Sequence, residues 1–230
     1  MADRPYVLLS CGMSIDGYLD NATGQRLLLS NDADFDRVDA VRAECDAILV
    51  GAGTVRQDNP RLLVRSQARR AERVARGLRP TPVKVTVTGR GDLDPEARFF
   101  ALGDIDKLVY CASPALDEAR RRLGQVATVV DSGEPVDLHR VVTDLHDRGV
   151  GRLMVEGGGK IHTQFLTADL VDELHLVIAP FFVGDSRAPR FVGDGRFPWR
   201  PDRRAVLAGC QQIGDVVLLR YALSDRFGES

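Results

Sequence analysis

The sequence lacks features that mark several large classes of protein. Its four cysteines form no Cys-x-x-Cys pair, so the spacing of a structural zinc site is missing. No apolar run reaches the roughly 18 residues that a transmembrane helix needs, and the first residues show no signal-peptide pattern. We therefore expect a cytoplasmic protein with reduced cysteines, no metal and no membrane partner.

The chain also lacks an excess of charge of either sign. Lysine and arginine number 31 and aspartate and glutamate 33, so the formal net charge is −2. A dedicated nucleic-acid-binding protein usually carries a basic field. The arginine-rich stretch between residues 65 and 79 has no interleaved aromatic residues, which favours a solvated helix. We expect no nucleic-acid partner.

What is present is the composition of a folded α/β protein. Hydrophobic residues make up 44% of the 230 residues, and apolar runs typical of buried strands alternate with stretches of helical spacing. Strands are predicted at 6–13, 47–50, 83–88, 108–111, 128–130, 152–155 and 174–179, and helices at 31–44, 114–123, 137–147 and 161–166. Residues 205–210 and 216–221 flank a Gly-Asp turn and predict an antiparallel hairpin. The order predicts one domain over residues 1–230, a three-layer α/β fold with a mixed, mostly parallel central sheet.

Three turns after predicted strands are candidates for chemistry, because ligands of open α/β sheets bind beyond the carboxyl ends of strands. Residues 51–54 (Gly-Ala-Gly-Thr) suit either an anion or a tight turn. Glu156 precedes three glycines, and so many glycines favour the close approach of a pyrophosphate at the following helix. Asp16, before Gly17, is by default a turn residue.

The end of the predicted strand at 83–88 bears on which dinucleotide the chain would bind. A Rossmann fingerprint is excluded, because its third glycine would fall at Arg56. The strand at 83–88 ends in Thr88-Gly89-Arg90, without an acidic residue for a ribose diol. Arg90 would suit a 2′-phosphate, although it is also an ordinary turn residue. We expect NADPH to be preferred over NADH.

Four segments occur in an order that points to one family. They are GMSIDG (12–17), DAILVGAGTVRQDNPRLLVR (46–65), LMVEGGGKIHTQFL (153–166) and LVDELHLVIAPFFVG (170–184). Together they resemble the pyrimidine reductases of riboflavin biosynthesis, which have a dihydrofolate-reductase-like fold. That family includes the C-terminal domain of the bifunctional deaminase–reductase and stand-alone archaeal and fungal enzymes. The resemblance covers most of residues 4–192.

The resemblance implies a homodimeric oxidoreductase that uses NADPH to reduce the ribosyl group of a ribosylaminopyrimidine 5′-phosphate to a ribityl chain. With the turns above, it assigns eleven residues to the cofactor: Gly12, Met13, Gly53, Thr54, Asp58, Thr88, Arg90, Gly158, Gly159, Lys160 and Ile161. It assigns Arg42, Leu62, Arg65 and Glu156 to the substrate. Guanidinium groups match phosphate oxygens, which suits the two arginines.

The catalytic candidates are two carboxylates. We expect Glu156 to orient the substrate as a hydrogen-bond acceptor, and Asp16 to be either structural or a proton relay, with water as an alternative proton donor. Reduction of a pterin or folate, and a nucleotide-binding regulator without turnover, remain alternative functions. Subunit contact is expected at the apolar stretch 177–183, interpreted as an edge.

One stretch bears on the choice of pyrimidine. Fused bacterial enzymes carry Ser and Trp before the first helix, where this chain has Arg26 and Leu28, which is more similar to the stand-alone branch. Stand-alone enzymes reduce before deamination, so their substrate is the diaminopyrimidinone. Because the chain resembles the family as a whole, both the diamino and the deaminated pyrimidine remain open as substrates.

Overall fold

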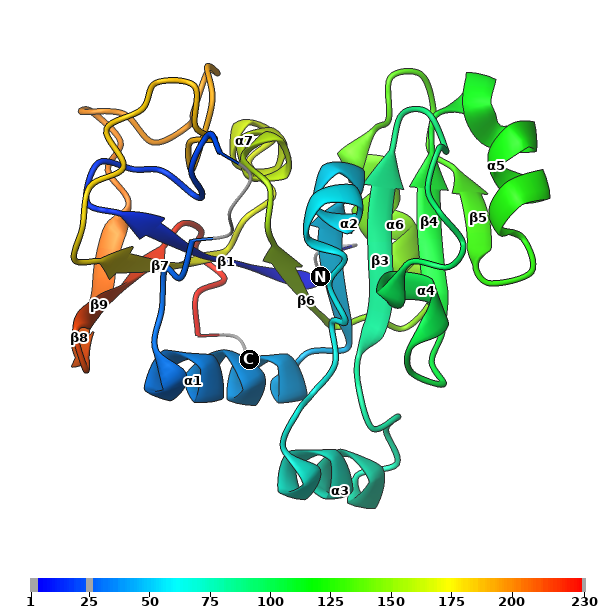
Figure 1. Ribbon diagram of the computed structural model, residues 1–230, viewed down its shortest axis with the longest axis horizontal. Helices are drawn as coiled ribbons and strands as arrows, with labels where there is room; N and C mark the ends of the chain where they lie inside the picture. Colours follow the sequence, from blue (N-terminus) through cyan, green and yellow to red (C-terminus); the bar gives the residue numbers. More distant parts are fainter. Residues whose placement is uncertain (1–3, 24–26, 229–230) are drawn as a thin grey trace. The chain divides into compact units, whose positions relative to one another are not determined.

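The computed structural model describes residues 4–23 and 27–228, and these group into two compact units (Figure 1). The first unit holds residues 4–5 and 39–154, and the second holds 6–23, 27–38 and 155–228. The expectation of a single domain over residues 1–230 stays a prediction. In the described ranges, no helix is long and apolar enough to cross a membrane.

The first unit is built on a parallel sheet with the strand order β5-β4-β3-β2 and with β6 beside β2. Its strands are β2 (Ala47–Gly51), β3 (Val83–Thr88), β4 (Lys107–Cys111), β5 (Thr128–Asp131) and β6 (Arg152–Glu156), the last of which leads into the second unit. Its helices are α2 (Ala52–Asp58), α3 (Gln67–Ala75), α4 (Arg98–Ala101), the 3-10 turn η1 (Ser113–Ala115), α5 (Leu116–Leu123) and α6 (Leu138–Asp147).

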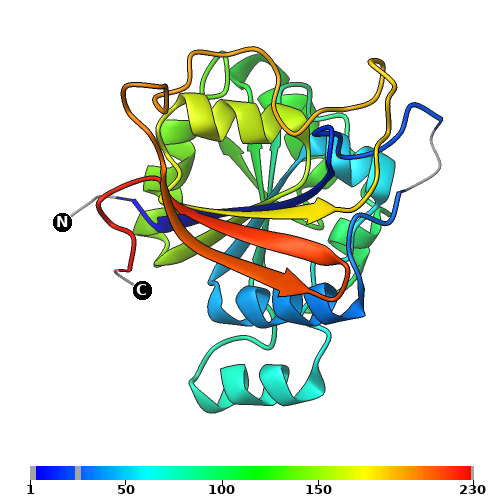
Figure 2. The ribbon, with the colours of Figure 1, turned by 90° about the vertical axis from the view of Figure 1, so that its left-hand side faces the viewer.

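The second unit has the strand order β1-β7-β9-β8. Its strands are β1 (Tyr6–Ser14), β7 (Glu173–Ala179), β8 (Val206–Ile213) and β9 (Val216–Ala222). β1 and β7 are parallel, and β8 and β9 form an antiparallel hairpin. Figure 2 shows α7 (Gly159–Thr167) on one face of this sheet and α1 (Asp32–Glu44), which runs on into the first unit, on the other. The predicted mixed, mostly parallel sheet and C-terminal hairpin are confirmed.

Two short helices, α2 and α4, lack the apolar spacing from which the longer helices are predicted. α2 begins directly after β2, where the sequence predicts only a turn at 51–54; its N-cap is Gly51, which offers no side-chain hydrogen bond. α4 has four residues and no capping side chain at its start. A helix of one or two turns has too few residues to show a period of 3.6, so its stability depends on tertiary contacts.

Lys84 in β3 supplies such a contact to α4. It is fully buried, and its ammonium group donates to the carbonyl oxygens of Phe99 at 3.0 Å and Leu102 at 2.6 Å. The last carbonyls of a helix have no partner within the helix, so Lys84 caps α4 from the sheet. Burial, reinforced by the charge of Lys107, lowers the pKa of Lys84 to about 8.

We expect Lys84→Met to lower the free energy of unfolding by roughly 2–4 kcal/mol, because two carbonyls lose their donor. Lys84 releases its proton near pH 8 when folded and near pH 10.5 when unfolded. Between these values the unfolded chain binds more protons, so Lys84 makes the wild type more stable as pH rises. Urea unfolding at pH 7.5 and 9.5 should therefore show a larger gap between wild type and variant at pH 9.5. A gap that does not change with pH would contradict the lowered pKa.

The core of the second unit corrects the expected subunit edge. β7 lies between β1 and β9, so it is an interior strand. Val177 and Ala179 are 1% exposed and pack with Ile213, Val216 and Leu218. The prediction that 177–183 forms an edge is therefore wrong for its strand residues. A continuous apolar run in a strand buried on both faces looks the same in sequence as an apolar edge. The outer strand of this unit is β8.

Candidate active site

The carboxyl ends of β2 and β3 meet at one edge of the first unit. Gly51 pairs with Val87 in the parallel register, so α2 and the turn after Thr88 begin side by side. Four predicted cofactor residues come together there: Gly53, Thr54, Thr88 and Arg90. Thr54 and Thr88 are buried, whereas Arg90 is exposed. Asp58, at the end of α2, is also exposed.

Two glycines at this edge have no reason in the fold for being glycine. Gly53 and Gly89 have ordinary backbone angles, and a Cβ at either position would meet no atom of the described residues within 4 Å. Glycine has a lower helix propensity than alanine, so Gly53 does not favour the start of α2. The open space over both glycines fits a ligand that approaches the backbone closely.

The turn after β3 is built tightly. Thr88 Oγ1 accepts hydrogen bonds from the backbone N–H groups of Arg90 at 3.3 Å and Gly91 at 3.0 Å. Gly91 has a φ of +65°, and a Cβ there would lie 2.6 Å from Cβ of Ala119 in α5. Glycine is required here by both the turn and the packing. The Thr88 hydroxyl oxygen is therefore part of the turn.

A second group of predicted residues lies on the loop from 59 to 66. Asp39 in α1 accepts from the backbone N–H groups of Arg65 and Ser66 and, at 3.0 Å, from the Arg69 guanidinium. Burial opposes ionisation of Asp39, but these hydrogen bonds outweigh it and lower its pKa. Arg42, one helical turn further along α1, donates to the carbonyl oxygen of Leu63 at 3.4 Å. The loop therefore brings Arg42 and Arg65 to one side of the first unit.

Leu62 in this loop has a strained backbone. Its φ is +46° although its side chain is buried, and Asn59 at the end of α2 has a φ of +43°. A left-handed conformation costs a residue such as leucine about 1–3 kcal/mol, and such strain clusters at ligand sites. The resemblance assigned Leu62 to the substrate, but no local pattern in the sequence predicts its unusual angle.

In the second unit, Glu156 ends β6 and the three glycines lead into α7. Gly157 and Gly158 have φ of +65° and +95°, and a Cβ on Gly159 would overlap the carbonyl oxygen of Arg190. The fold itself therefore requires glycine at all three positions, so their number is no evidence for a pyrophosphate. The start of α7 is better evidence, because its N-cap Gly158 offers no side-chain hydrogen bond to the first N–H groups. Lys160 in that first turn is exposed, and Ile161 is buried.

Gly12 and Met13 lie near the end of β1 and pair with Val177 and Ile178. A Cβ on Gly12 would lie 3.1 Å from the carbonyl oxygen of Leu29, so glycine permits a close approach of the segment before α1. Arg26 lies outside the described residues. Leu28 is 67% exposed.

Asp16 joins the loops that follow β1 and β7. Its carboxylate accepts from the Ser14 hydroxyl at 2.6 Å and from the backbone N–H groups of Val183 and Gly184, the latter at 2.8 Å. Desolvation opposes ionisation, but these hydrogen bonds dominate and lower the pKa of Asp16 to about 2. A group ionised throughout the neutral range holds no proton to donate. The contacts favour the structural alternative for Asp16 over the proton relay.

Sequence reasoning missed Arg56 and Asp92. Asp92 lies two residues after Arg90 and forms an ion pair with Arg56 at 2.8 Å. Arg56 entered the sequence argument only as the place of a missing glycine. The proximity arises from the pairing of β2 with β3, which residue spacing alone does not reveal.

None of the four histidines and four cysteines is among the residues assigned to the cofactor or the substrate. His139 and His146 are exposed, as predicted from the apolar face of their helix. His162 is fully buried; its Nδ1 lies 3.1 Å from the carbonyl oxygen of Phe191, and burial lowers its pKa to about 4. The four cysteines are free, and Cys45 and Cys111 are buried. Among the described residues, no three His, Cys, Asp or Glu side chains are placed to hold a metal ion.

Comparisons with known proteins identify the family of the chain. A sequence model described as the RibD C-terminal domain matches residues 5–219. The chain is 38% identical over 187 residues to a 2,5-diamino-6-ribosylamino-4(3H)-pyrimidinone 5′-phosphate reductase of Archaeoglobus fulgidus, a match that covers 81% of this chain and 85% of the relative.

Solved structures support the fold. A pyrimidine reductase-like protein from Corynebacterium diphtheriae superposes with a TM-score of 0.80 at 24% identity, covering 95% of this chain and 91% of that one. Dihydrofolate reductase from Enterococcus faecalis gives a TM-score of 0.51 at 11% identity, covering 94% and 95%. The predicted dihydrofolate-reductase-like fold is confirmed. The chain belongs to the RibD C-terminal domain family, the reductases of riboflavin biosynthesis.

Proposed function

We propose that this chain uses NADPH to reduce 2,5-diamino-6-ribosylamino-4(3H)-pyrimidinone 5′-phosphate to its ribitylamino form. The observation that carries the proposal is the 38% identity, over about four-fifths of both chains, to the A. fulgidus reductase with that substrate in its name. It favours the diamino pyrimidine over the deaminated one. A cytoplasmic location stays a prediction of the sequence.

Each unit by itself offers residues that suit part of a nicotinamide dinucleotide. Gly53 and Gly89 leave open space at the carboxyl edge of the first unit, and the start of α7 in the second unit has no capping side chain. When bound, NADPH supplies the hydride that reduces the ribosyl carbon attached to nitrogen. The N–H groups of residues 159–161 would hold the pyrophosphate, because a helix N-terminus attracts anions. Thr54, Asp58 and the backbone at Gly12 and Met13 are proposed further contacts.

The substrate roles follow from the chemistry of each side chain. Arg42 and Arg65 would bind the 5′-phosphate through charge-assisted hydrogen bonds. Leu62 would contact the substrate, and Glu156 would accept hydrogen bonds that fix the orientation of the substrate. The proton that completes the reduction would come from water, because the contacts of Asp16 hold it ionised.

The test is NADPH oxidation by the purified chain with each of the two phosphorylated pyrimidines. We expect turnover at least tenfold faster with the diamino substrate. Faster turnover with the deaminated substrate would overturn the substrate assignment, and activity only with a pterin or folate would overturn the pathway. Binding of NADPH without turnover of any of them would identify a regulator.

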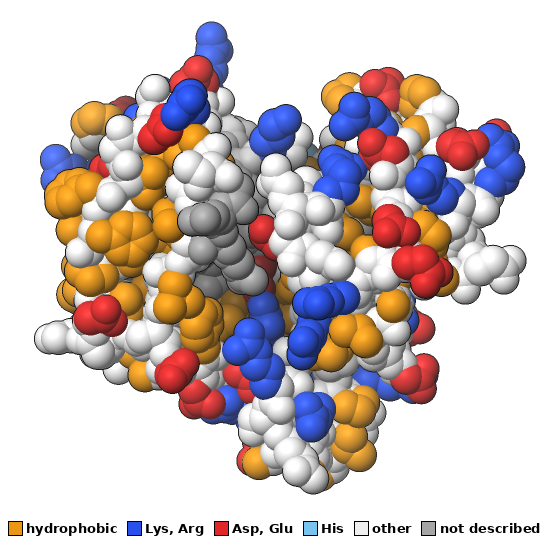
Figure 3. Space-filling view, in the orientation of Figure 1, with side chains coloured by type: hydrophobic (Ala, Val, Ile, Leu, Met, Phe, Trp, Pro, Cys, Tyr) orange, Lys and Arg blue, Asp and Glu red, His pale blue; other side chains and the backbone are white. Residues whose placement is uncertain are grey.

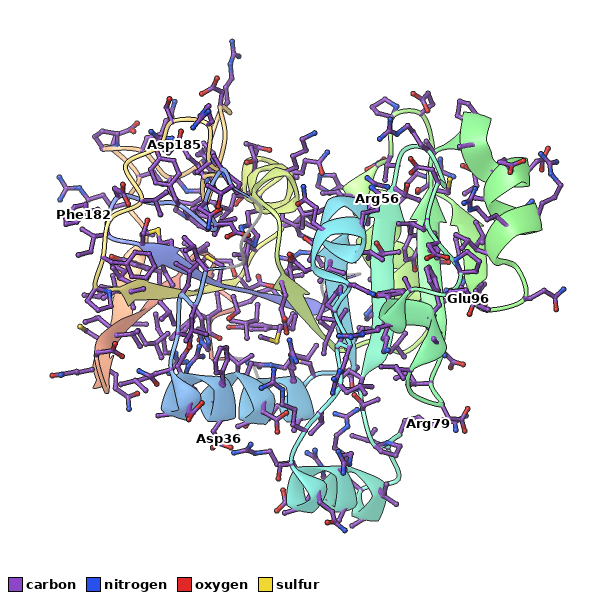
Figure 4. The ribbon with its side chains drawn as sticks, viewed as in Figure 1. Asp36, Arg56, Arg79, Glu96, Phe182 and Asp185 are labelled. Carbon is purple, nitrogen blue, oxygen red and sulfur yellow. The ribbon has the colours of Figure 1, made fainter. Side chains whose placement is uncertain are left out.

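We also propose that the chain forms a homodimer through β8. This outer strand contains no charged residue and no proline, and Val206 and Leu207 on it are 65% and 54% exposed. An uncharged edge strand is a template for pairing with another chain. Figure 3 shows further hydrophobic side chains on the second unit, where Phe182, labelled in Figure 4, is 70% exposed.

Leu207→Lys is expected to weaken this dimer by more than tenfold, because a buried lysine at a strand edge opposes pairing. Light scattering over a concentration series would measure the mass. Val74→Lys on α3 is the matched control, since Val74 is also 54% exposed. Equal masses for wild type and Leu207→Lys at every concentration would reject β8 as the interface.

A further inference from the structure

Two arginines from neighbouring strand ends converge on one carboxylate in the first unit. Asp92 lies 2.8 Å from the Arg56 guanidinium and 3.5 Å from that of Arg90. Arg56 belongs to α2, which follows β2, and Arg90 follows β3; Figure 4 labels Arg56 on α2. Figure 3 shows basic side chains, with carboxylates among them, around this edge. The cluster keeps one net positive charge.

The protein holds this cluster in place from one side. The turn from Thr88 to Gly91 is closed by two hydrogen bonds to Thr88 Oγ1 and is packed against Ala119. Asp92 follows directly, so its backbone position is set by that turn. The two arginines are less constrained, since their side chains are 38% exposed at Arg56 and 77% at Arg90.

Open space lies beside each arginine. Gly53 is three residues before Arg56 and therefore on the same face of α2. Gly89 directly precedes Arg90. A Cβ on either glycine would meet no described atom within 4 Å, and neither glycine has a positive φ. Each of the two open glycines therefore neighbours one arginine, Gly53 along a face of α2 and Gly89 along the chain.

Dinucleotide sites use these two side-chain types for opposite purposes. A carboxylate accepts hydrogen bonds from the ribose 2′-hydroxyl of NADH, whereas an arginine accommodates the 2′-phosphate of NADPH. This edge contains both, and the ion pairs of Asp92 offset its charge. No acidic residue stands at positions 88–90, directly at the end of β3, but Asp92 follows two residues later and is engaged by two arginines.

We propose that Arg56, Arg90 and Asp92 form the element that distinguishes a 2′-phosphate from a 2′-hydroxyl. The two arginines bind the phosphate, and Asp92 is a latent acceptor for the hydroxyl that they mask. The inference rests on the proposed function, since it takes the bound cofactor to be a nicotinamide dinucleotide. It adds Arg56 and Asp92 to the predicted Arg90 and gives each a separate, measurable effect.

Calorimetry with NADPH and NADH on the wild type and five variants tests the proposal. Arg56→Gln and Arg90→Gln should each lower the affinity for NADPH about three- to tenfold and leave the affinity for NADH unchanged. The effect is modest because both guanidinium groups are partly exposed. The double variant should bind the two cofactors about equally. Asp92→Asn alone should raise the affinity for NADPH about two- to fivefold, because an anion that competes with the phosphate for the arginines is lost. Arg121→Gln, which breaks the exposed Arg121–Glu118 pair of α5, is the control.

The outcomes separate this inference from the proposed function. If the wild type binds and oxidises NADPH but the double variant keeps the cofactor ratio of the Arg121→Gln control, the inference is wrong and the proposed function stands. If the wild type binds neither dinucleotide, both are wrong. As a further check, adding Asp92→Asn to the double variant should lower the affinity for NADH, because the carboxylate that could accept from the 2′-hydroxyl is removed. An unchanged NADH affinity would overturn the role given to Asp92.

Discussion

Arg65→Ala is expected to raise the KM for the phosphorylated substrate by roughly ten- to a thousandfold, because a charge-assisted hydrogen bond to the phosphate is lost. The affinity for NADPH should change little, since Gly53, Thr54 and the start of α7 are untouched. The dephosphorylated substrate, which never makes the contact, should behave as it does with the wild type. Steady-state kinetics on both substrates measures the difference.

Asp39→Asn separates the charge of Arg65 from the position of its loop. Asp39 holds the backbone N–H groups of Arg65 and Ser66 and lies on the same face of α1 as Arg42. Its substitution should loosen the loop and raise the KM for both substrates, without the selectivity for phosphate that Arg65→Ala shows. Equal losses on both substrates for Arg65→Ala would mean that Arg65 supports the loop, and Arg42 would then be the phosphate ligand to test.

Much of the fold could be predicted because its strands are short, apolar and separated by clear helices. β3, at Val83–Thr88, has the predicted bounds, and the hairpin of β8 and β9 follows from the Gly214-Asp215 turn. The position of β7 in the sheet could not be predicted, because strand order is set by long-range pairing. An apolar run such as 177–183 is compatible with either an edge or a centre.

The candidate site shows the same division. The sequence indicated the turns after β2, β3 and β6, but it attributed the three glycines before α7 to a ligand, whereas backbone angles and Arg190 account for them. The informative glycines are Gly53 and Gly89, which stand in open space. Only coordinates distinguish a glycine that the fold requires from one that it does not.

Substitution of the two carboxylates named as catalytic candidates should affect different properties, catalysis for Glu156 and stability for Asp16. Glu156 is proposed to accept hydrogen bonds from the substrate, so Glu156→Ala should lower kcat/KM by roughly thirty- to three-hundredfold. Glu156→Gln keeps one acceptor oxygen and should lose only about three- to tenfold. Neither change should alter the shape of the pH profile of kcat, because Glu156 is not assigned a proton transfer.

Asp16→Asn is the matched carboxylate control, since the pKa of Asp16 is held at about 2 by hydrogen bonds from Ser14, Val183 and Gly184. Above about pH 4 Asp16 is ionised, so its removal cannot delete a titrating limb in the neutral range. We expect kcat to stay within a few-fold of the wild type while thermal stability falls, because the loops after β1 and β7 lose their shared anchor. The alternative, in which Asp16 relays a proton, requires a large loss of kcat with stability preserved. A general-acid role for Glu156 would instead make Glu156→Gln as damaging as Glu156→Ala and remove one limb of its pH profile.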